Sequence, residues 1–323
     1  MSIIVFSESR NGKFKKHTFE SISYASNIAK NISSQVIAVS IGKVSNEELT
    51  QLARYGANKI ISVSDDKNQN LDNQVYTKII SDIAKKENAG IIIFCNSFAG
   101  KAIAPRLSVK LKAGLAPGVV ALPEAYSPFS VKRRTYNGGA FSNVVINTDV
   151  KILTINQNSC DIVENPVDAP IETYVPEADD SLYNTIVKDI NVVTGKIILT
   201  EADIVVSGGR GMKSGDNWKP IEELAKLLGA GLACSRPVSD EGWRPHEEHV
   251  GQTGKIIAPN LYLAVGISGA IQHIGGVSAS KVMVAIDKDP EAPIFQHADY
   301  GIVGDAMKVL PRLIESVKKY KDL

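Results

Sequence analysis

The chain has 323 residues, of which 44% are hydrophobic and 22% are charged, a composition typical of a globular protein with a substantial core. Its net charge of +1 at pH 7 excludes a strongly basic surface for nucleic acid or for an anionic membrane. Its three cysteines lie far apart and form no Cys-x-x-Cys pair, so we expect no disulfide framework, no cysteine-based metal site and a reducing, cytoplasmic compartment.

The first half of the chain alternates apolar runs with amphipathic helical patterns. The runs are short and continuously apolar, as in strands buried on both faces of a parallel sheet, at residues 3–6, 36–39, 60–63 and 91–94. Between them, residues 22–32 and 75–84 place apolar side chains on one helical face. This alternation predicts a doubly wound sheet. Because the chain begins in such a run and every apolar run is short, we expect neither a targeting leader nor membrane insertion.

The middle of the chain, residues 114–191, is rich in proline. Strand-like runs at residues 144–146 and 152–155 predict extra strands that complete the first domain. Residues 164–181 are predicted to form an irregular linker. Because a new strand–helix alternation begins near residue 202, the sequence predicts two domains, residues 1–194 and 195–323.

The second half opens with a strand at residues 202–206, a glycine-rich segment at residues 207–215, and a helix at residues 221–228. Strand, glycine loop and helix is the geometry that directs free amides and a helix dipole toward a phosphate. The spacing of Gly209, Gly211 and Gly215 only approximates the dinucleotide fingerprint. A tight turn without a ligand is an equally good interpretation of this segment.

A second strand and glycine turn follow at residues 261–273. Ser268 is predicted to cap the next helix, and Gly269 to allow close approach of a pyrophosphate. Gln272 and His273 would then lie in the first helical turn near the same ligand, although a buried, hydrogen-bonded histidine is the usual alternative. A final helix is predicted at residues 305–320.

Other polar residues of the second half allow two interpretations each. Thr253 either faces a ligand or completes a turn, and Arg236 either contacts a ligand or lies on the surface. His246 and His249 are predicted to be solvated, because their spacing differs from that of a metalloprotease helix. Cys234 is predicted to be a packed core thiol. No acid–base pair or metal site is recognisable, which favours a cofactor-binding protein without substrate chemistry of its own.

Four segments of the second half resemble one known family closely, at residues 251–259, 261–273, 289–295 and 298–303. They are similar to the α subunit of electron transfer flavoproteins, including the bacterial and archaeal homologues named for electron supply to nitrogen fixation. The likeness covers nearly all of the second domain. In the first domain it is looser and depends on the strand–helix alternation and on residues 133–139.

This resemblance implies a two-domain α/β fold. The N-terminal domain would be a doubly wound sheet of the adenine-nucleotide-hydrolase type, and the C-terminal one a Rossmann-like parallel-sheet domain that binds FAD. The protein would pair with the electron transfer flavoprotein β subunit as an αβ heterodimer. It would be an electron carrier and not an enzyme. Electrons would come from dehydrogenases, such as the acyl-CoA dehydrogenases of fatty acid β-oxidation, and pass through a flavin semiquinone to a quinone oxidoreductase or another acceptor.

The resemblance also implies the FAD contacts. Arg236 would lie over the flavin, Thr253 would bond its N5 region, and a protonated His273 would approach its O2 edge, so that these three tune its potential. Asp287 stands near the adenosine end where the family usually has asparagine. The implied FAD contacts are Arg210, Ser235, Arg236, Val250, Gly251, Gln252, Thr253, Ser268, Gly269, Ala270, Ile271, Gln272, His273, Asp287, Asp305 and Ala306.

Two alternative functions use the same kind of fold. One is an NAD-dependent oxidoreductase. This alternative is weakened because no clear acidic residue follows the first glycine loop at the spacing where it would bind the ribose. The other is an adenine-nucleotide-binding module in the first domain. Residues 7–12, which follow its first strand, do not form a convincing phosphate loop.

Overall fold

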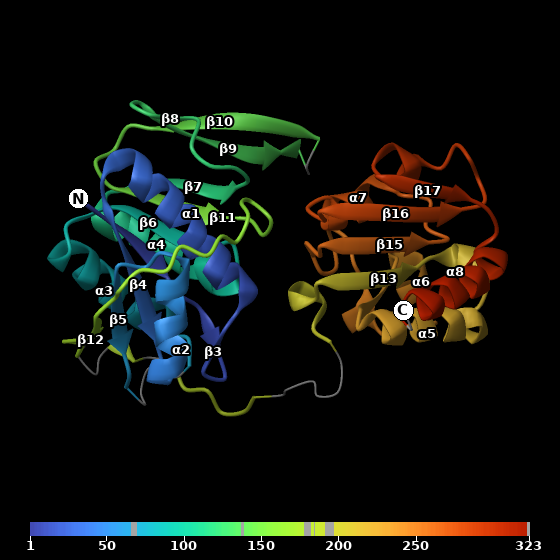
Figure 1. The fold of residues 1–323 in the computed structure, drawn as a ribbon, viewed down its shortest axis with the longest axis horizontal. Coiled ribbons are helices and arrows are strands. Elements are labelled where there is room, and N and C mark those ends of the chain that lie inside the picture. Colours follow the sequence, from blue (N-terminus) through green and yellow to red (C-terminus); the bar gives the residue numbers. More distant parts are fainter. Residues whose placement is uncertain (66–69, 137–138, 178–181, 184, 191–196, 322–323) are drawn as a thin grey trace. The chain divides into compact units, whose positions relative to one another are not determined.

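The structure, a computed structural model, describes residues 1–65, 70–136, 139–177, 182–183, 185–190 and 197–321 (Figure 1). The chain forms two compact units, Met1–Asn191 and Val192–Leu323. The predicted boundary between residues 194 and 195 lies outside the described residues. So do residues 137 and 138 of the segment that carries the resemblance in the first half.

The first unit is built on a ten-stranded sheet in the order β10-β9-β7-β11-β6-β1-β4-β5-β12, with β8 paired to β9 (Figure 1). Its strands are β1 (Ser2–Phe6), β4 (Gln35–Ile41), β5 (Lys59–Val63), β6 (Ala89–Cys95), β7 (Gly114–Val119), β8 (Ala125–Tyr126), β9 (Phe129–Thr135), β10 (Ala140–Ile146), β11 (Lys151–Ile155) and β12 (Ile171–Thr173). A separate hairpin joins β2 (Ser9–Arg10) to β3 (Lys13–Phe14).

Helices cover both faces of this sheet, as predicted for a doubly wound fold. They are α1 (Lys16–Ile32), α2 (Asn46–Thr50), the 3-10 helix η1 (Gln51–Tyr55), α3 (Asn73–Lys86) and α4 (Phe98–Leu111). Alternate residues of β1 belong to different cores, since Ile3 packs with α1 and Ile4 with α3 and α4. This burial on both faces explains why the strand sequences are continuously apolar.

The prediction that residues 164–181 form an irregular linker is wrong for one short segment. Residues Ile171–Thr173 form β12, which pairs in parallel with β5 at the edge of the sheet. A three-residue strand with exposed Ile171 and Thr173 carries no detectable hydrophobic pattern. Its pairing is decided by the free edge of β5.

The second unit contains a parallel sheet in the order β14-β13-β15-β16-β17. Its strands are β13 (Ile204–Gly208), β14 (Gly231–Cys234), β15 (Leu261–Val265), β16 (Val282–Asp287) and β17 (Tyr300–Val303). Its helices are η5 (Leu199–Glu201), η6 (Arg210–Met212), η7 (Gly215–Trp218), α5 (Lys219–Leu228), α6 (Arg236–Asp240), η8 (His246–Glu248), α7 (Ile271–Val277), η9 (Pro293–Gln296) and α8 (Ala306–Lys321). The strand order reverses between β13 and β15.

Two hydrophobic cores hold the second sheet. α5 and α8 pack on one face against Val206 and Val265, while α7 packs on the other face against Tyr262 and Ala264. Cys234 is fully buried in the first of these cores, as predicted. Among the described residues, none of the helices combines the length and the apolar content needed to cross a bilayer.

Candidate functional site

A cavity of about 710 Å³ lies at the carboxyl ends of the strands of the second unit. Its walls come from the segments that follow β13, β14, β15 and β16, and from the loop around Val250 and Thr253. In open parallel sheets, ligands bind in the crevice outside the carboxyl ends where the strand order reverses. Here that position is between β13 and β15. The volume is within the range of cofactor sites.

The glycines after β13 and β15 allow two turns to contact each other. A Cβ on Gly209 would lie 2.1 Å from the carbonyl oxygen of Gly266, and a Cβ on Gly211 would lie 2.6 Å from the Cα of Gly266. Hydrogen bonds join the turns, because the Gly209 amide donates to Val265 and the Gly211 amide to Gly266. These glycines therefore serve backbone packing, and Gly211 and Gly266 also line the cavity.

The turn after β15 corrects one of the predictions. α7 begins at Ile271 with Ala270 at its N-cap position, so Ser268 does not cap it. Gly269 has φ +86°, and a Cβ there would lie 2.5 Å from the backbone nitrogen of Ile294. The backbone conformation and the contact with Ile294 therefore require glycine here, since most other residues avoid such a positive φ. Gly269 also lines the cavity, and the close approach of a pyrophosphate to it stays a prediction.

Hydrogen-bond donors and cationic side chains from the turns after β13 and β15 line the cavity. Ser268, Gly269 and Ala270 line the cavity, and their amides donate no hydrogen bond within the described part of the chain. Lys213 pairs with Asp305 at 2.8 Å, which is the largest of the causes that lower the pKa of that carboxyl. Unbonded amides and cationic side chains that line the same cavity suit a phosphate group.

Arg236 and Thr253 lie together on another part of the wall. Nη1 of Arg236 is 3.4 Å from Oγ1 of Thr253, although the two residues come from α6 and from the loop before β15. The guanidinium also pairs with Asp240 at 3.3 Å, and both partners are more than half exposed. The arginine therefore presents a cation at the cavity that the exposed carboxylate offsets only weakly.

His273 lies in the cavity wall with one ring nitrogen engaged. Its Nε2 is 2.7 Å from the hydroxyl of Tyr262 on β15, while its Nδ1 is buried without a partner of normal hydrogen-bond geometry. Burial lowers the pKa of His273 to about 4. The imidazole is therefore neutral at pH 7, and the expectation of a protonated His273 is wrong for the protein without a ligand.

His249 was predicted to be solvated, but the structure places it in the cavity wall at 3% exposure. Burial lowers the pKa of His249, and the nearby charges of His246 and Arg236 lower it further. Its Nδ1 is also buried without a partner. The spacing of residues 246–249 did not reveal this burial, because it depends on the bridge that joins Cys234 to His249. His246 is exposed, as predicted.

Most of the predicted contact residues meet at this one cavity. Those that line it are Arg210, Ser235, Arg236, Val250, Gly251, Thr253, Ser268, Gly269, Ala270, Gln272, His273, Asp287, Asp305 and Ala306. Gln252 and Ile271 do not, and Ile271 is 71% exposed. Lining residues that the sequence did not indicate include Lys213, Asp240, His249, Lys288 and Asp289.

The neutral His273 predicts a pH dependence of stability. Its folded pKa, about 4, is below the ordinary 6.5, so the unfolded chain binds a proton that the folded chain does not. We expect the unliganded protein to lose on the order of 2 kcal/mol between pH 7 and pH 5 from this group. Urea unfolding at several pH values should show a flatter pH dependence for His273→Gln. Parallel curves for the two proteins would contradict the assignment.

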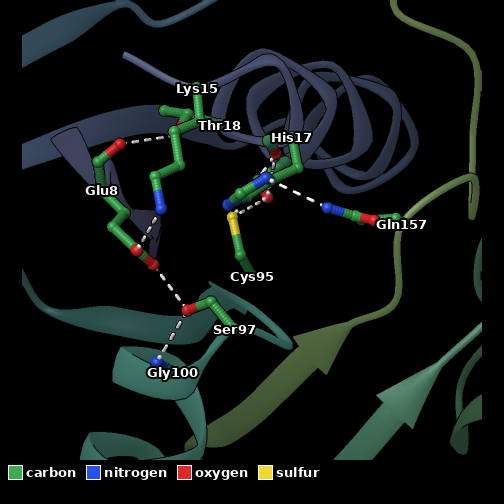
Figure 2. Close-up of polar contacts among 9 residues, drawn as sticks. Glu8, Lys15, His17, Thr18, Cys95, Ser97, Gly100 and Gln157 are labelled. Carbon is green, nitrogen blue, oxygen red and sulfur yellow. Dashed lines mark hydrogen bonds and ion pairs between the residues drawn. The ribbon is translucent and has the colours of Figure 1, made fainter. Parts of the chain in front are cut away.

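The matching position in the first unit is filled by the chain's own charged groups (Figure 2). There the strand order reverses between β1 and β6, and Glu8 and Ser97 follow these strands. The Glu8 carboxylate accepts from Ser97 and pairs with Lys15 at 3.2 Å, while Ser97 Oγ accepts from the Gly100 amide at the start of α4. The groups that would bind a phosphate here already have a carboxylate partner.

Comparisons with known proteins place both halves of the chain in one group. Residues 198–278 match the family described as electron transfer flavoprotein FAD-binding domain, and residues 3–179 match the electron transfer flavoprotein domain. Electron transfer flavoprotein subunit alpha of Syntrophomonas wolfei subsp. wolfei is 38% identical over 316 residues, 98% of each chain. The same subunit of Bacillus subtilis is 36% identical, over 98% of this chain and 97% of its own. The probable mitochondrial subunit alpha of Caenorhabditis elegans is 37% identical, over 97% and 92%.

Proposed function

Since the chain belongs to the family of electron transfer flavoprotein alpha subunits, we propose that it holds one FAD in the cavity of the second unit and carries electrons from a dehydrogenase to an acceptor. FAD is the cofactor that the matched domain of this family binds. Membership as an alpha subunit also implies a beta-subunit partner. The donor, whether an acyl-CoA dehydrogenase or another, the quinone-linked acceptor and the cytoplasmic location stay predictions.

The observation that carries this proposal is the combination of donors and cations around one cavity. The amides of residues 268–270 and the cations Arg210 and Lys213 suit the pyrophosphate of FAD. The buried, unpartnered Nδ1 of His273 and the paired Arg236 and Thr253 suit the polar edge of an isoalloxazine. The residues present therefore fit the cofactor of the family.

The protein's own groups would bind and tune the cofactor. FAD supplies the ability to accept electrons, and the chain positions it and sets its potential. Arg236 would place a positive charge beside the ring system, which favours extra negative charge there. His273 and Thr253 would add hydrogen bonds to individual atoms of the flavin ring system. Asp287 would accept a hydrogen bond at the adenosine end, in place of the family's asparagine.

Arg236→Ala should lower the potential for the first electron while largely retaining FAD. A cation about 4 Å from a negative charge contributes on the order of 4 kcal/mol at an effective dielectric constant near 20. Because Arg236 is 62% exposed at its side chain and pairs with Asp240, we expect a reduced effect, a shift on the order of tens of millivolts. Potentiometric titration of the αβ heterodimer checks this, with Arg312→Ala on α8, outside the cavity wall, as the control. Identical potentials in the variant and the parent would refute the role.

Co-expression with the beta subunit tests the function itself. We expect a yellow heterodimer whose alpha subunit retains FAD, and reduction of that FAD by a reduced dehydrogenase. A colourless heterodimer that takes up no added FAD would overturn the proposal. The adenine-nucleotide alternative has less support, because Glu8 already engages Lys15 and Ser97 at the corresponding position of the first unit (Figure 2). Binding of AMP without flavin would favour that alternative.

A further inference from the structure

The buried pair of Tyr262 and His273 behind the cavity has a feature that the proposed FAD contact does not explain. Tyr262 is fully buried on β15, on the face of the sheet that α7 covers. His273, on α7, is 7% exposed and lines the cavity. The tyrosine is not a lining residue, so it can act on a ligand only through the histidine.

The hydrogen bond between them determines where their protons lie. Tyr262 Oη is 2.7 Å from His273 Nε2. Burial raises the pKa of Tyr262, so the phenol keeps its proton and needs a buried acceptor for it. The Ser207 hydroxyl is close enough to lower that pKa, yet it forms no hydrogen bond of normal geometry. Nε2 is therefore the acceptor for the phenol.

A neutral imidazole carries one proton, so accepting at Nε2 places that proton on Nδ1. His273 is neutral at pH 7, because burial lowers its pKa. The backbone of Val250 acts as a hydrogen-bond acceptor in raising the pKa of His273, which favours a proton on the nitrogen that Tyr262 does not engage. Nδ1 is buried, and its contact with Val250 is too distorted to count as a normal hydrogen bond, so its N–H is not committed to that carbonyl.

We propose that Tyr262 is a positioning residue that fixes His273 in the Nδ1–H tautomer, so that the cavity wall presents a hydrogen-bond donor to the FAD. This inference rests on the proposed function, since it takes FAD as the ligand that His273 meets. A fixed donor favours an oxygen or nitrogen acceptor of the ring system, and favours it more as that atom gains negative charge. A freely exchanging tautomer would present an acceptor lone pair to the same atom part of the time.

Tyr262→Phe tests the proposal, since it removes the hydroxyl and keeps the ring. The matched control is Tyr300→Phe, at an exposed position of β17 in the same unit. The αβ heterodimer is labelled with ¹⁵N-histidine, and its ring nitrogens are observed by NMR at pH 7 before and after FAD is added. The chain has five histidines, so the signals of His273 are assigned by their loss in His273→Gln.

We expect protonated Nδ1 and unprotonated Nε2 at His273 in the parent, and a shift toward the Nε2–H tautomer in Tyr262→Phe. The dissociation constant of FAD should rise about fivefold in that variant and stay unchanged in Tyr300→Phe, in keeping with loss of one hydrogen bond. A parent His273 protonated at Nε2 overturns the proposal. So does a Tyr262→Phe variant whose tautomer changes while FAD affinity and reduction potentials do not.

The same experiment separates this proposal from the proposed function. The tautomer of His273 is measured in the heterodimer before FAD is added, so it is decided whether or not flavin binds. Failure of the parent heterodimer to bind FAD would overturn the proposed function. The NMR signals would then decide the tautomer independently.

Discussion

Replacing Gly209 by alanine should abolish FAD binding and destabilise the second unit by about 3 kcal/mol or more, the upper end for overpacking. The new Cβ would lie 2.1 Å from the carbonyl oxygen of Gly266 and 2.7 Å from a side-chain carbon of Ile267. The carbonyl cannot move aside without disturbing the hydrogen bond that it accepts from Gly211. Separating these turns would displace the wall where the strand order reverses.

Gly229→Ala is the control for this effect. Gly229 ends α5 with φ +64°, and a Cβ there would meet nothing within 4 Å. Alanine at this position should cost about 1 kcal/mol through backbone conformation and leave FAD bound. Urea unfolding and flavin absorbance measure both results. Similar losses of stability in the two variants, with FAD retained in both, would contradict the predicted effect of crowding at Gly209.

Arg244→Met should destabilise the second unit by about 3 to 5 kcal/mol, as expected when one partner of a buried ion pair is removed. Arg244 contacts both carboxylate oxygens of Glu248 at 2.7 and 3.0 Å, and also reaches Glu222 at 2.6 Å. The Glu248 side chain is only 5% exposed, so water cannot replace the guanidinium. Because Glu248 directly precedes His249 in the cavity wall, we also expect weaker FAD binding.

Lys318→Met provides the comparison with an exposed pair. Lys318 lies 2.7 Å from Glu223, and both side chains are about half exposed. Loss of such a pair should cost less than about 1 kcal/mol. Denaturant unfolding of both variants checks the contrast, and equal losses would show that burial of Glu248 is not the deciding factor. Arg244→Met combined with Glu248→Leu should recover part of the lost stability, since the buried charge is then gone.

Helices with a strong apolar period could be predicted from the sequence. The helix predicted at residues 221–228 is α5, Lys219–Leu228, and the one predicted at residues 305–320 is α8, Ala306–Lys321. Pro220 lies in the first turn of α5, where a missing amide hydrogen costs nothing. The protonation state of His273 could not be predicted from the sequence, because it depends on burial between segments that are distant along the chain.

Local sequence also determined which groups gather at the site, because strands of one parallel sheet end at the same edge and the turns that follow them must meet there. The cavity accordingly collects the segments after β13, β14 and β15, although the contacts of their residues with FAD stay predictions. Only the tertiary structure decided what each group can do. Gly209 and Gly269 cannot be replaced by larger residues, because backbone from another turn lies against them. His249 is buried and His273 is held by Tyr262, because packing across the sheet excludes water from both rings.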